Sequence, residues 1–99
     1  MQKRLNQLTI KVSIAADSFG DDHPLAMAAE FLSAASDDLC DASIEDPGST
    51  ERAMALASAL QNVDNAQNQS ERMGFPFSLR IEVCAFVARF NAWIESLQA

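Results

Sequence analysis

The stretch that decides the fold is residues 24–43, PLAMAAEFLSAASDDLCDAS. Small and large apolar side chains recur in it at alternating intervals of three and four residues. They are Leu25, Ala28, Leu32, Ala35, Leu39 and Ala42. This 3.5-residue spacing places all six on one side of an α-helix, as a continuous seam. Three of the six are alanines, which let a neighbouring helix approach closely. The stretch therefore predicts a long amphipathic helix that packs against other helices.

Local signals set the ends of this helix. Asp21 and Asp22 precede it, Asp22 or His23 can cap its first turn, and Pro24 suits the first helical position, which needs no backbone donor. Residues 45–49, EDPGS, form the clearest loop of the chain. Ser49 is the expected N-cap of a following helix.

Three further helices are expected around this one. Residues 3–19 carry an apolar stripe that Gly20 ends. Its members are Leu5, Leu8, Val12, Ala15 and Phe19. After the loop a seam runs through Ala53, Leu56, Leu60 and Val63, and a polar run up to Arg72 follows, as a solvated helix end or a loose connection. Gly74 can end that helix and Pro76 can begin the last one. The last helix carries the heptad of Leu79, Val83, Phe86, Phe90, Trp93 and Leu97.

Residues 7–14 and 77–83 admit a second interpretation, because apolar and polar residues also alternate there with the two-residue period of a strand. An α+β fold with both segments as strands is the alternative. We favour an all-α fold, since the rest of the chain offers little for a lone strand to pair with. The prediction is a single domain, residues 1–99, built as a small antiparallel bundle of three or four helices, with four favoured.

Composition excludes several classes of function. The net charge is −7, which disfavours direct binding to nucleic acid phosphates. No apolar run is long enough to span a membrane, and polar residues break up the apolar segment of a signal peptide. Cys40 and Cys84 are too few for a disulfide framework, so we expect two buried free thiols and a cytoplasmic protein.

The residue patterns that catalysis requires are not found. His23 is the only histidine, and no Glu stands three residues before it, as a di-iron bundle needs. The acidic loop from Asp41 lacks the Gly and Glu of an EF-hand. The glycines are isolated turn residues, and neither cysteine has the basic neighbourhood that stabilises a thiolate. We therefore predict no enzyme, no metal site and no cofactor.

The acidic side of the 24–43 helix is the candidate partner-binding surface. Residues 17–51 hold ten of the fourteen acidic residues of the chain and no Lys or Arg. On a helical wheel the carboxylates of this helix cluster opposite the seam, beside two apolar residues that can anchor a partner. The candidate residues are Met27, Glu30, Phe31, Asp37, Asp38, Asp41 and Glu45. They predict a small binding module for a basic partner protein, such as an inhibitor, immunity protein, antitoxin or chaperone.

Four apolar residues lie off the predicted seams and suggest a different function. They are Ile10, Ile14, Phe77 and Ile81. A helix that is apolar on two sides is central in a bundle or lies at an oligomer interface. These residues therefore predict a homodimer, and with it a structural or assembly subunit as the first alternative. A bundle that binds a small ligand is the second alternative.

Overall fold

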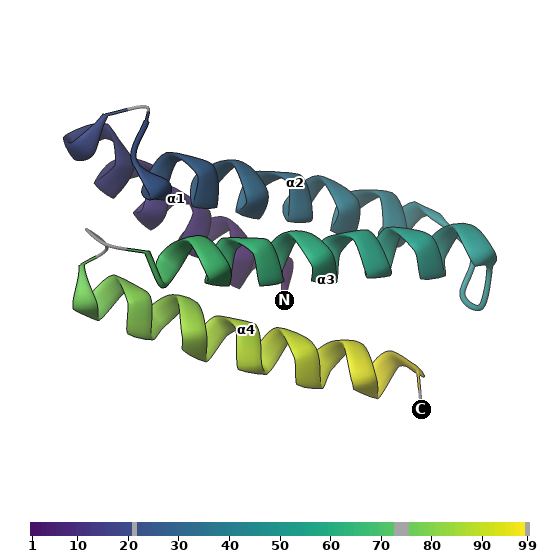
Figure 1. The fold of residues 1–99 in the computed structure, drawn as a ribbon. Coiled ribbons are helices and arrows are strands. Elements are labelled where there is room, and N and C mark those ends of the chain that lie inside the picture. Colours follow the sequence, from purple (N-terminus) through teal and green to yellow (C-terminus); the bar gives the residue numbers. More distant parts are fainter. Residues whose placement is uncertain (21, 73–75, 99) are drawn as a thin grey trace.

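The computed structural model describes residues 1–20, 22–72 and 76–98, and these form four α-helices and no strand (Figure 1). The helices are α1 (Gln2–Phe19), α2 (Pro24–Ile44), α3 (Thr50–Ser70) and α4 (Phe77–Gln98). Helices that follow one another in the chain run antiparallel, and α3 lies between α2 and α4. The prediction of an all-α antiparallel bundle is confirmed. The alternative strands at 7–14 and 77–83 are wrong, because these residues belong to α1 and α4.

The signals that the sequence places at helix ends make the expected contacts. His23 is the N-cap of α2, and its Nδ1 accepts a hydrogen bond from the Leu25 N–H at 3.2 Å. Ser49 caps α3 in the same way, because its hydroxyl accepts from the Arg52 N–H at 3.2 Å. Gly20 ends α1 at φ 95°, a conformation that glycine adopts without strain. Asp21 and Gly74, which we also expected at boundaries, lie outside the described residues.

The core is one apolar cluster to which all four helices contribute. All six residues of the α2 seam are buried in it, as predicted. Of all the helix pairs, α2 and α3 make the most extensive contact. Alanines with no exposed surface lie on both of these helices, at Ala28 and Ala35 on α2 and at Ala59 and Ala66 on α3. Such small side chains allow the two backbones to approach closely, so the alternation of Leu and Ala along α2 fixes how its neighbour packs.

The seam of α3 differs from the prediction. Ala53 is exposed and Leu60 only half-buried, whereas the buried residues are Leu56, Ala59, Val63, Ala66 and Ser70. The polar run after Val63 is therefore helical as far as Ser70. The buried Ser70 hydroxyl donates to the Gln67 carbonyl at 2.6 Å, which satisfies it inside the core. The seam of α3 therefore continues through the small residues Ala66 and Ser70, and a pattern of large apolar side chains does not include them.

The seams of α1 and α4 also shift near their ends. Phe19 is 51% exposed, and Ala16 is buried in place of Ala15. In α4, Val87 and Ile94 are buried, while Trp93 is half-buried and Leu97 exposed. A heptad pattern has a period of 3.5 residues, and an α-helix has 3.6 residues per turn. Over several turns the buried side of a straight helix therefore moves away from the heptad positions.

The predicted burial of both cysteines is wrong. Cys40 is exposed and Cys84 is only half-buried. Cys40 follows the seam residue Leu39 and so lies about 100° around the helix from it. It faces α1, where the Gln2 side-chain amide donates to its sulfur at 2.7 Å.

The close packing of α2 and α3 makes a testable prediction. Replacing Ala59 by leucine is expected to lower the free energy of unfolding by about 1–3 kcal/mol, because the site has no room for three more carbon atoms. The same change at Ala57, which is exposed on the same helix, is expected to alter it by less than about 0.5 kcal/mol. Urea denaturation followed by circular dichroism measures both. Equal effects at the two positions would show that small residues are not required between these helices.

Candidate functional site

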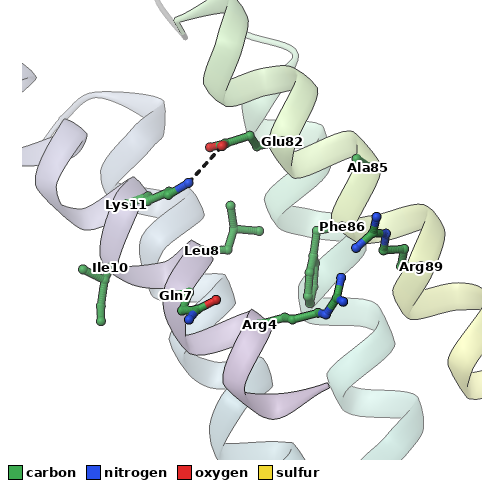
Figure 2. A pocket seen from close by; sticks show the side chains of 9 residues that line it. All are labelled: Arg4, Gln7, Leu8, Ile10, Lys11, Glu82, Ala85, Phe86 and Arg89. Atoms are coloured by element: carbon green, nitrogen blue, oxygen red, sulfur yellow. Dashed lines mark hydrogen bonds and ion pairs between the residues drawn. The ribbon is translucent and has the colours of Figure 1, made fainter.

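The bundle is open along one edge. Contacts between α1 and α4 are the least extensive among the neighbouring helices, whereas α1–α2, α2–α3 and α3–α4 pack more fully. A groove with a volume of about 570 Å³ lies between α1 and α4 (Figure 2). We call it the α1–α4 groove. It is lined by Arg4, Gln7, Leu8, Ile10, Lys11, Glu82, Ala85, Phe86 and Arg89.

The groove has an apolar floor that belongs to the core. Leu8 of α1 and Phe86 of α4 are each 6% exposed and lie between the two helices (Figure 2). Ala85 adds a small side chain on α4. Ile10 lies at the α1 rim with 59% of its surface exposed. The groove therefore combines a nearly buried apolar floor with an exposed apolar side chain at its α1 rim.

Charged side chains stand at both ends of the groove, and most of them are positive. Lys11 Nζ binds Glu82 Oε1 at 2.9 Å across one end, and this is the one ion pair between side chains that the structure describes. Arg4 and Arg89 extend from the two helices toward the other end, beside Phe86 (Figure 2). Three cations and one carboxylate give the lining a net charge of about +2. The whole chain carries −7.

The four predicted dimer residues all lie on the outside of α1 and α4. Their exposed fractions are 59% for Ile10, 64% for Ile14, 69% for Phe77 and 51% for Ile81. Ile10 lines the groove directly, and Ile81 precedes the groove residue Glu82. The guanidinium of Arg80 lies over the Phe77 ring, 5.6 Å from its centroid. These apolar side chains are free to meet another molecule, and the homodimer stays a prediction.

The predicted acidic surface is divided by the structure. Glu30, Asp37 and Asp41 are exposed on α2, together with Met27, which is 45% exposed. Asp38 instead faces α3, and its carboxylate accepts from the Ser58 hydroxyl at 2.9 Å and the Asn62 amide at 2.8 Å.

Two further members of the predicted set leave the acidic surface. Phe31 is half-buried and packs against the core. Glu45 lies just after α2 and lines a different cavity. The structure therefore brings together four of the seven predicted residues, namely Met27, Glu30, Asp37 and Asp41.

That second cavity opens near the α2–α3 loop and has a volume of about 450 Å³. Met1, Leu39, Leu56 and Trp93 form part of its apolar lining, and Glu45 and Arg52 are among its polar residues. It is the place that fits the small-ligand alternative, which stays a prediction. Within the described ranges, no three His, Cys, Asp or Glu residues are grouped so that they could hold a metal ion.

The sequence interpretation missed the basic residues of the groove. Arg4, Lys11 and Arg89 are three of the seven Lys and Arg residues in the chain, and the distance between them in sequence hides their grouping. The available signal is that the chain has few cations and that three of the seven, Lys3, Arg4 and Lys11, lie in the first helix. Their convergence depends on the packing of α1 beside α4.

Comparisons of this chain with protein-family models, with curated proteins and with solved structures found no match. Among the four described helices, none combines the length and the apolar character needed to cross a membrane.

Proposed function

We propose that this protein is a protein-binding module and that the α1–α4 groove receives a helix of its partner. The open edge between α1 and α4 is the observation that carries the proposal. Two antiparallel helices with a gap between them present ridges and grooves into which a third helix can pack. Recognition of an amphipathic helix by an apolar groove is a recurrent mode of protein binding.

Exposed apolar side chains beside the groove support the proposal. Ile10, Ile14 and Ile81 each expose at least half of their surface on the two helices that border it. Full burial of one such side chain contributes about 1.5–3 kcal/mol. A helix as long as α1, which has 18 residues, extends about 27 Å and can contact several of them at once.

Site-specific photo-crosslinking in the native host tests the proposal. A photo-reactive amino acid in place of Gln7, which is exposed in the groove, is expected to capture a discrete partner protein. The Ile81→Asp change is expected to abolish the capture, since it places a charge on the apolar border. Ile44→Asp is the matched control, because Ile44 is 80% exposed at the end of α2 and is not one of the residues that line the groove.

Two outcomes of this experiment contradict groove docking. One is a partner that crosslinks to position 7 equally well in the Ile44→Asp and Ile81→Asp proteins. The other is capture of only a second copy of this chain, which supports the assembly-subunit alternative.

The acidic surface is the second candidate, and one observation favours it. Glu30, Asp37 and Asp41 are exposed at spacings of seven and four residues, so they follow one side of α2 next to Met27. This surface suits the basic partner that the sequence predicts. Ser33 is exposed between Glu30 and Asp37, and the same photo-reactive residue placed there samples this surface. Capture from position 33 and none from position 7 makes the acidic surface the binding site.

A further inference from the structure

We infer that the helix bound in the α1–α4 groove is acidic, and that one or more of its carboxylates bind between Arg4 and Arg89. This inference rests on the proposed docking function and adds the chemistry of the partner. It follows from the charges that line the groove, which are opposite in sign to the charge of the chain as a whole.

Arg4 and Arg89 are placed to hold a carboxylate together. One comes from α1 and the other from α4, both are exposed, and both extend toward the same end of the groove beside Phe86 (Figure 2). Neither forms an ion pair with a described carboxylate of this chain. An arginine presents a planar fork of donors that matches a carboxylate in two hydrogen bonds. Two cations at one end of the groove raise the positive potential there, and an anion that binds at this end stabilises both.

The other end of the groove is already neutral. Lys11 and Glu82 satisfy each other across it. A carboxylate that approaches there meets the negative charge of Glu82, whereas one at the arginine end meets two cations. We therefore place the acidic residues of the partner helix at the arginine end and its apolar residues over Leu8 and Ile10.

The net charge of the chain does not prevent this binding. Salt at physiological ionic strength screens charges over about 8 Å, so a partner in the groove responds chiefly to the nearest charges. The molecule is 21 × 19 Å across its two shorter axes, and Glu30 and Asp37 are exposed on α2 rather than in the groove. Among the residues that line the groove, Glu82 is the one carboxylate. Two copies of this chain that met groove to groove would bring their cations together, which disfavours a symmetric homodimer at this surface.

Synthetic helical peptides and fluorescence anisotropy test the inference. Three 18-residue peptides contain the same number of leucines. The first is an amphipathic helix whose leucine stripe is flanked by Glu, the second has Lys in place of Glu, and the third has the residues of the first in scrambled order. We expect only the amphipathic Glu peptide to bind well, and its affinity to fall as salt rises from 0.1 to 0.5 M. Arg4→Glu with Arg89→Glu is expected to weaken it by about 100-fold, or about tenfold for each arginine.

A matched double variant separates local from global charge. Lys3→Glu with Arg72→Glu makes the same change in net charge at exposed residues outside the groove lining, and we expect less than about a threefold effect. Circular dichroism verifies that both variants keep their helical structure.

The inference is overturned if the Lys peptide binds more tightly than the Glu peptide, if the two double variants weaken binding equally, or if no peptide binds. It is also overturned if sedimentation shows that a second copy of the chain occupies the groove. Photo-crosslinking at position 7 keeps the two proposals separate. If a partner is captured at position 7 and its binding is unaffected by the Arg4 and Arg89 changes, groove docking is retained and the acidic helix is rejected.

Discussion

Replacing Phe90 by alanine is expected to lower the free energy of unfolding by about 3–5 kcal/mol, the largest loss we expect from a single substitution. Phe90 has no exposed surface and is the largest fully buried side chain of the core. Its ring lies 5.7 Å from the ring centroid of Phe86 and 5.7 Å from that of Trp93. Alanine removes the buried ring and both aromatic contacts, and it leaves a cavity that rigid helices cannot close. Since small domains have about 5–15 kcal/mol in total, the variant is expected to be marginally folded.

The matched control for Phe90→Ala is the same substitution at Phe77. Phe77 lies in the same helix but exposes 69% of its surface, and the Arg80 guanidinium lies over its ring. Losing that contact costs about 0.5–1 kcal/mol. Urea titrations of the two variants and the parent protein, followed by the helical circular dichroism signal, give the three free energies. A loss at Phe90 no greater than the loss at Phe77 would mean that α4 does not pack through this face.

The difference between strong and weak patterns explains how much of the fold was predictable. In α2, leucine and alanine alternate over six positions, so one period accounts for the whole buried face. In α3, the buried face continues through Ala66 and Ser70, which stand among Asn and Gln residues and look polar in sequence. Burial of small residues is decided by how close the neighbouring helix comes. That distance is a property of the packed bundle and leaves no mark in the periodicity of one helix.

The candidate site was also predictable only in part. A helical wheel separates a seam from an opposite face, and it places Glu30, Asp37 and Asp41 correctly on the exposed side. It fails for Asp38 and Phe31, because a helix in a bundle has two neighbours that also cover the flanks of its seam. The α1–α4 groove was not predictable, because its arginines are 85 positions apart in the sequence and meet only through the packing of α1 beside α4.

Replacing Asp38 by alanine is expected to have the second large effect on stability. The free energy of unfolding of the Asp38→Ala protein is expected to lie about 2 kcal/mol below that of the Asp37→Ala protein. Asp38 accepts two hydrogen bonds from α3, an exposed one from Ser58 and a partly buried one from Asn62. Because water can replace the exposed bond, we expect a loss near the lower end of the about 1.5–3 kcal/mol that hydrogen bonds to a charged group contribute. Asp37 is exposed, and no side-chain hydrogen bond of its carboxylate is found among the described residues. Both changes gain the same helix propensity, up to about 0.7 kcal/mol, so the comparison isolates the contact with α3.

The outcome at Asp38 also decides how the acidic surface can be tested. Asp38→Asn keeps one oxygen acceptor, so we expect the Asn protein to retain part of the stability that the Ala protein loses. If Asp38 acted only through its charge, the Asn and Ala proteins would be equally destabilised. If Asp38→Ala and Asp37→Ala unfold at the same urea concentration, the contact with α3 is dispensable and Asp38 is available to a partner. If they differ as expected, a charge reversal that includes Asp38 loosens the α2–α3 pair and reduces partner binding indirectly. Charge reversals at Glu30, Asp37 and Asp41, which are exposed, then measure recognition by the acidic surface without disturbing the fold.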